Sequence, residues 1–199
     1  MHKNHGIRLA ALIGGITIAL LATPLRAAAG ERDDDDRDRG KAPRVQWVDH
    51  FDLLSGDPQA VTTSSTSTNS GVGTGLTGLV VTSPVTGDTD SFGGNKVVHM
   101  ALELQPGTRI RGVRLCYELS GSSYIEQIRL AQIQNPPATA LVLLDDATPQ
   151  LDPGPVCVNS TILSKPIQSQ KGSVLLSFRF NTVVTSDKIV IRAVGLLVD

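Results

Sequence analysis

The segment DTDSFGG contains two aspartates whose spacing suits a calcium-binding loop. Asp88, Asp90 and Gly93 stand at positions 1, 3 and 6 of such a loop. Phe92 and His99 occupy positions 5 and 12, where oxygen ligands are needed. Backbone carbonyls could complete an irregular calcium shell, but a polar turn before a strand is the simpler interpretation.

A second group of aspartates, Asp145, Asp146 and Asp152, lies in a turn-rich segment. Gathered carboxylates there could bind calcium or sugar hydroxyls, and a solvated loop is the simpler interpretation. Asp88, Asp90 and these three residues are therefore weak calcium candidates. Apart from calcium at these positions, the sequence indicates no cofactor.

The most acidic run, Glu31 to Lys41, does not match a metal-binding loop. Counted from Asp34, the glycine position is Arg39 and the last ligand position is Val45. Interleaved arginines would also repel a cation. A segment this charged buries too little apolar surface to offset its ordering entropy, so we interpret it as a disordered spacer.

Catalytic residues are scarce beyond residue 29, where His50 and His99 are the only histidines. Asp49 and Asp52 are sequence neighbours of His50, a poor arrangement for a Ser-His-Asp triad, and no G-x-S-x-G motif occurs. The sequence therefore gives no support for nucleophilic hydrolysis.

A glycosidase needs two opposed carboxyl groups. The glutamates beyond the spacer, Glu103, Glu118 and Glu126, all lie in strand-like segments. Glu103 and Glu118 flank a proposed hairpin, across which they could pair with Arg111 or Arg114. This pairing needs no catalysis, and we expect the protein not to be an enzyme.

Binding to nucleic acid is disfavoured by charge and composition. The formal net charge is −1 and aromatic residues make up 4% of the chain, whereas phosphate backbones require clustered positive charge. The small basic group Arg109, Arg111 and Arg114 is better interpreted as a solvent-facing sheet surface.

The N-terminus has the pattern of an export signal. Lys3 and Arg8 precede an apolar run from Leu9 to Thr23, and Pro24 and the alanines up to Ala29 suit peptidase cleavage. We predict a signal peptide over 1–29, rather than an uncleaved anchor, and a charged spacer over 30–43. The expected location is secreted or periplasmic, with no membrane span after cleavage.

The two cysteines, Cys116 and Cys157, both lie beyond the predicted signal. An even count in an exported chain favours a disulfide over two buried thiols. We therefore predict a Cys116–Cys157 bond, and we favour it over a metal site because structural zinc needs about four ligands.

Hydrophobic residues alternate through most of residues 79–199, as expected of half-buried strands. Val98, Met100 and Leu102 share one face of a predicted strand, and a second has Val174, Leu176, Phe178 and Phe180 on one face. Gly112 falls where the alternation slips, which predicts a bulge. The apolar segment 188–198 is expected to lie centrally in a sheet.

Residues 124–134 are ambiguous between strand and helix. As a strand, Tyr124, Ile128 and Leu130 would face inward. As a helix, Ile125, Ile128 and Gln132 would share a face. Turn signals on both sides favour the strand. By contrast, the Ser/Thr/Gly-rich segment 62–78 gives little to pack and is interpreted as a flexible loop.

Seven to nine short strands with little helix predict an all-β fold, a single antiparallel, jelly-roll-like β-sandwich over 44–199. Such a chain without catalytic residues is expected to have a structural, adhesive or surface-interaction role, as an oligomer if it self-associates. The alternative is a carbohydrate-binding module, with calcium a candidate cofactor. The expected partner is accordingly a protein or a polysaccharide.

Overall fold

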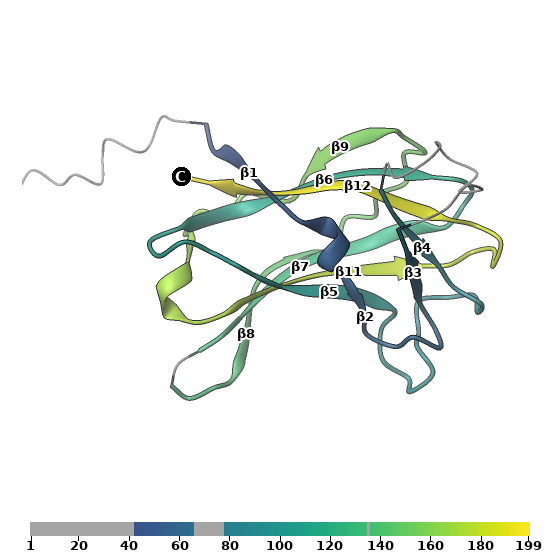
Figure 1. Ribbon diagram of the computed structural model, residues 1–199, viewed down its shortest axis with the longest axis horizontal. Helices are drawn as coiled ribbons and strands as arrows, with labels where there is room; N and C mark the ends of the chain where they lie inside the picture. The colour runs from purple at the N-terminus through teal and green to yellow at the C-terminus, as the bar shows by residue number, and fades with distance from the viewer. Residues whose placement is uncertain (1–41, 66–77, 135) are drawn as a thin grey trace, which may run out of the picture. The chain divides into compact units, whose positions relative to one another are not determined.

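A computed structural model describes residues 42–65, 78–134 and 136–199, which form two antiparallel sheets packed as a sandwich (Figure 1). The predicted all-β sandwich is thus confirmed. The described residues contain no α-helix, only 3-10 turns at His50–Asp52 and Ser169–Lys171, and none of their helices is long and apolar enough to cross a membrane. The predicted signal peptide, the spacer to residue 41 and residues 66–77 lie outside the described ranges.

The first sheet has seven strands in the order β10-β6-β12-β4-β3, with β1 also paired to β12 and β9 to β6. Its strands are β1 (Arg44–Val48), β3 (Thr62–Ser64), β4 (Leu79–Thr82), β6 (Arg109–Leu119), β9 (Val156–Asn159), β10 (Ile167–Gln168) and β12 (Ile189–Val198). All of the segment 188–198 except Lys188 forms β12, which lies centrally, as predicted. Strand structure begins at Thr62, inside the segment whose composition favours a loop.

The second sheet has five strands in the order β2-β5-β11-β7-β8. Its strands are β2 (Leu54–Ser55), β5 (Val97–Leu102), β7 (Tyr124–Ile133), β8 (Ala140–Asp146) and β11 (Val174–Asn181). The predicted inward faces of β5 and β11 are buried in the core between the sheets. Alternation along each strand places the opposite side chains on the outer face of this sheet.

A bulge in β6 confirms the irregularity predicted at Gly112. Leu197 of β12 pairs with Gly112, but the next residue, Val198, pairs with Ile110, so Arg111 is an extra residue. Buried residues on both sides of the extra residue can therefore face the core.

Residues 124–133 form a strand, which confirms the favoured interpretation, but its inward face differs from the prediction. Ile125, Ile128 and Leu130 are buried, whereas Tyr124 is only half-buried. The register shifts at this point because Glu126 is an extra residue opposite β11. The bulge brings Ile125 into the core. A prediction that assumes a regular period of two along the strand cannot include this extra residue.

The proposed hairpin across residues 96–119 is wrong. The turn itself forms, with Thr108 N–H donating to Gln105 O at 3.1 Å and Gly107 at φ 85°. However, β5 and β6 on either side of it belong to different sheets. The turn at 105–108 leads from one sheet of the sandwich to the other. A short turn between two strands therefore did not mean that the two strands pair with each other.

The predicted disulfide joins Cys116 and Cys157 with an S–S distance of 2.02 Å. The two residues are directly opposite each other on β6 and β9. The bond therefore ties the short strand β9 to the longest strand of the first sheet.

Candidate functional site

The outer face of the five-stranded sheet has a row of polar side chains that crosses four strands. His99 of β5 pairs with Ser177 of β11, Ser177 pairs with Arg129 of β7, and Arg129 pairs with Asp145 of β8. At about 4.8 Å between neighbouring strands, this row extends over roughly 14 Å. A second row contains Arg179 of β11 and Gln127 of β7, with Glu126 at the bulge.

We call these seven residues, together with Asp88, the polar band: Asp88, His99, Glu126, Gln127, Arg129, Asp145, Ser177 and Arg179. All are half-buried or exposed. The band therefore presents both hydrogen-bond donors and acceptors on one sheet face.

One end of the band is fixed by Arg129 and Asp145. The Arg129 Nε and Nη2 atoms donate to the two carboxylate oxygens of Asp145 at 3.1 and 3.2 Å. The Gln127 amide donates to Asp145 Oδ1 at 2.5 Å. The bidentate contact between Arg129 and Asp145 holds the guanidinium in one orientation and leaves its other N–H groups for a ligand.

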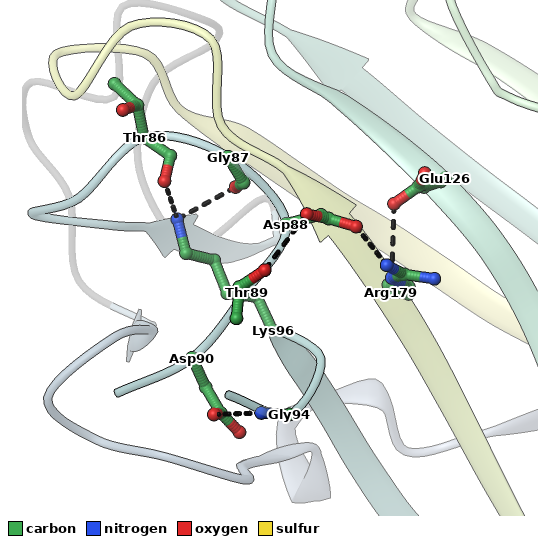
Figure 2. Close-up of polar contacts among 9 residues, drawn as sticks. All are labelled: Thr86, Gly87, Asp88, Thr89, Asp90, Gly94, Lys96, Glu126 and Arg179. Carbon is green, nitrogen blue, oxygen red and sulfur yellow. Dashed lines mark hydrogen bonds and ion pairs between the residues drawn. The ribbon is translucent and has the colours of Figure 1, made fainter. Parts of the chain in front are cut away.

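The other end is organised by Arg179, whose guanidinium lies between two carboxylates (Figure 2). Its Nε is 3.2 Å from Glu126 Oε2, and its Nη2 donates to Asp88 Oδ2. Burial opposes ionisation of Asp88, but hydrogen bonds and the Arg179 charge outweigh it, so the pKa of this carboxyl lies below its ordinary value. Asp88 is therefore an ionised partner of Arg179 at neutral pH.

The loop that holds Asp88 is anchored by a fully buried lysine. Lys96 is 0% exposed, and its ammonium donates to the carbonyls of Val85, Thr86 and Gly87. Figure 2 shows the ammonium pointing at the Thr86 and Gly87 carbonyls, directly before Asp88 in the chain. The three carbonyls form a cage around a side-chain cation, a contact that no sequence pattern indicated.

The predicted calcium candidates Asp88 and Asp90 accept hydrogen bonds from different protein donors. Asp88 pairs with Arg179, and Asp90 Oδ1 accepts from the Phe92 and Gly94 amides at 2.9 and 2.7 Å. Each carboxylate therefore already accepts hydrogen bonds from protein donors.

The second group of candidates is divided in the same way. Asp145 and Asp146 end β8 and differ in burial, Asp145 being exposed and Asp146 buried. Asp146 accepts from the amides of Thr148 and Thr161, and Asp152 from that of Gly154. In the described ranges, no three His, Cys, Asp or Glu residues lie close enough to hold a metal ion.

The candidate catalytic residues are also dispersed. Glu118 pairs with Arg192 on the seven-stranded sheet, whereas Glu126 lies on the five-stranded sheet. Glu118 therefore does not pair across a hairpin as predicted, and its partner is Arg192 of β12. His50 lies in a 3-10 turn, where burial lowers its pKa against the opposing effect of Asp49.

Ser177 and Arg179 alternate with the predicted core positions of β11, but the sequence does not single out the band. Arg129 and Gln127 were hidden because the 124–134 segment was ambiguous and contains a bulge. The available signal was the recurrence of Arg, Ser and Gln opposite core positions on two strands. Their alignment depends on strand order, which does not follow from one sequence.

No protein-family model matches the sequence, and no curated protein matches it either. Among solved structures, the chain is similar to the family 11 carbohydrate-binding module of cellulase Lic26A-Cel5E from Clostridium thermocellum, with 14% identity, 80% of this chain and 97% of that chain covered, and a TM-score of 0.42. A xylan-binding domain of CBM 22 has 14% identity, coverage of 73% and 86%, and a TM-score of 0.38.

The chain is also similar to the CBM22-1 and GH10 modules of C. thermocellum endo-1,4-β-D-xylanase 10B, with 9% identity and a TM-score of 0.41. The match covers 79% of this chain but only 28% of the xylanase chain. Likeness at this level assigns no ligand, and the function has to be inferred from the side chains of the polar band.

Proposed function

We propose that this chain is a non-catalytic polysaccharide-binding protein, and that the polar band is its binding surface. The observation that carries the proposal is the aligned row of His99, Ser177, Arg129 and Asp145. Sugar hydroxyls both donate and accept hydrogen bonds, so a surface that mixes donors and acceptors suits them better than a surface of one charge. A row across several strands suits an extended glycan chain better than a single small molecule.

The ion pairs within the band support this function because they reduce the cost of ordering side chains on binding. Arg129 is held by Asp145, and Arg179 by Glu126 and Asp88. Immobilising a long free side chain costs about 0.5–1.5 kcal/mol on binding, and these arginines are already positioned. Each arginine also keeps unused N–H groups for a ligand.

The band contains no tryptophan, tyrosine or phenylalanine. The exposed Trp47 belongs to β1, in the other sheet. Binding by the band would therefore depend on hydrogen bonds more than on stacking. The disulfide supports a location outside the reducing cytoplasm, where polysaccharides are encountered.

The test is binding of the purified protein to a panel of neutral polysaccharides by affinity electrophoresis and calorimetry. The double variant Arg129→Gln/Arg179→Gln should weaken binding at least about tenfold, because each lost charged hydrogen bond is worth more than about 1.4 kcal/mol. Arg192→Gln is the matched control, since its side chain is 23% exposed against 24% for Arg179 and also pairs with a glutamate.

Binding that is equal in both variants, or no binding to any polysaccharide of the panel, would contradict the proposal.

A second candidate function is self-association or adhesion through β1. Trp47 and Val45 are 55% and 36% exposed, and both lie against Gly195 on the outer face of the seven-stranded sheet. Exposed apolar residues grouped on one strand favour protein contacts. Light scattering of the wild type and of Trp47→Ser over a concentration series tests this candidate, which fails if the wild type stays monomeric.

A further inference from the structure

A cleft of about 330 Å³ lies between the two sheets at the β8 side of the sandwich. Its walls come from β7 and β8 of one sheet and from the segment 163–171, which includes β10 of the other. This volume falls at the lower end of the range for small-molecule sites. The cleft opens on a different surface from the polar band, because Gln132 and Leu141, which face each other in register, lie on inward-facing positions.

The floor of the cleft is built by a buried amide. Gln132 is 2% exposed, and its Nε2 donates to the carbonyls of Gln168 and Gly172 at 2.9 and 3.0 Å. Gly172 has φ 144°, and a Cβ there would lie 1.8 Å from Ile133 O. Only glycine fits, so the segment that closes the floor is held tightly against β7.

The opposite wall is fixed by Arg111, the bulged residue of β6. Its Nη1 donates to the carbonyls of Leu163 and Ser164 at 3.3 and 2.7 Å, while Leu163 N–H donates to Arg111 O at 2.7 Å. Asp199 in turn accepts from Arg111 Nε at 2.7 Å. The cleft is therefore a preformed feature of the fold.

The charge of the lining is of one sign. Lys165 and Lys171 line the cleft, and no acidic residue does. Within the described residues, neither lysine forms an ion pair or a side-chain hydrogen bond. Both side chains are exposed, so their charges are available to an anionic group at low desolvation cost.

The rest of the lining combines apolar and amide surfaces. Leu141, Leu143 and Leu163 supply apolar contact, while Gln134, Gln168 and Ser164 supply donors and acceptors. A ligand that suits this lining has a carboxylate for the lysines, hydroxyls for the amides and a C–H face for the leucines. A fatty acid lacks the hydroxyls, and inorganic phosphate lacks the apolar face.

We propose that this cleft is a second binding site, which takes a uronic acid residue of an acidic saccharide. The lysines contact the carboxylate, the glutamines and Ser164 contact the ring hydroxyls, and the sugar ring packs on the leucines. The residues that line the cleft support this second site by themselves, so it does not depend on glycan binding at the polar band.

The experiment titrates the purified protein with trisaccharides of galacturonic, glucuronic and mannuronic acid, each compared with its methyl ester. The ester keeps the sugar and removes the charge. At least one acid should bind, at least about tenfold more tightly than its ester, and added salt should weaken it. Lys165→Gln/Lys171→Gln should weaken acid binding at least about tenfold. Lys188→Gln should not, because Lys188 precedes β12 and does not line the cleft.

The variant Arg129→Gln/Arg179→Gln separates the two sites, because it should leave uronate binding unchanged even if the polar band binds no glycan. Failure of all three acids to bind would overturn the proposal. It would also be overturned if the lysine variant bound like the wild type, or if phosphate and acetate competed as well as the trisaccharide, which would indicate a general anion site. Unchanged thermal unfolding of the variants confirms that they are folded.

Discussion

Replacing Lys96 with methionine tests whether a buried ammonium holds the loop in front of the polar band. Methionine keeps an apolar stem of similar length and removes the charge. Three carbonyls, those of Val85, Thr86 and Gly87, then lose their donor. Asp88, which follows these residues, loses part of what positions it beside Arg179 (Figure 2).

The Lys96→Met variant is expected to lose about 3 kcal/mol of the free energy of unfolding. Hydrogen bonds from a charged donor are worth about 1.5–3 kcal/mol each. Part of this sum is offset because the variant no longer buries a charge, which costs several kcal/mol. Water can also reach carbonyls on the exposed residues Val85 and Thr86.

Denaturant and thermal unfolding measure the effect. A loss of about 3 kcal/mol lowers the Tm of a domain of this size by about 6–12 °C. Lys188→Met is the control, because among the described residues Lys188 forms hydrogen bonds through its backbone alone. It should change the free energy of unfolding by less than about 0.5 kcal/mol. If Lys96→Met unfolds at the same temperature as the wild type, the carbonyl cradle adds no net stability and the reasoning fails.

Three further predictions concern stability. Burial lowers the pKa of Lys96 below 10.5, against the opposing effect of Asp88. Because the unfolded chain then binds more protons than the folded protein just below pH 10.5, the free energy of unfolding of the wild type relative to Lys96→Met should rise as the pH increases toward 10.5. A difference that does not change with pH would contradict this. Removing the disulfide by Cys116→Ala/Cys157→Ala opens a loop with a sequence separation of 41 and should cost about 4 kcal/mol in urea unfolding; two thiols that react with an alkylating agent before reduction would show that no bond had formed. The Asp152 backbone acts on the buried Tyr117 hydroxyl, although no hydrogen bond of ordinary geometry joins them. Tyr117→Phe should therefore change the free energy of unfolding by less than about 1 kcal/mol, and a larger loss would show that this contact is a full hydrogen bond.

Strands with a regular alternation were predictable from local pattern alone. Val98, Met100 and Leu102 in β5, and Phe178 and Phe180 in β11, lie on the faces that the sequence indicates. This works because a strand places successive side chains on opposite faces and burial selects the apolar one. The pattern fails at β7, where the bulge at Glu126 changes the phase.

The two candidate sites were less predictable because their residues come from distant segments. Arg129 and Asp145 meet only because β7 pairs with β8, and Ser177 joins them only because β11 lies on the other side of β7. In the cleft, Lys165 lies just before β10 of the first sheet, whereas Gln132 lies on β7 of the second. No local pattern indicates which sheet a strand joins, as the turn between β5 and β6 demonstrates.

The all-β class, most strand faces and the cysteine pair could be inferred from the residues alone, since these follow from residue types and from a period of two. The tertiary structure alone decided the strand order, the placement of Arg129 and Arg179 in one band, the burial of Lys96 among carbonyls and the cleft beside Lys165. The physical reason is that hydrophobic burial acts on each strand separately, whereas polar contacts depend on which strands become neighbours.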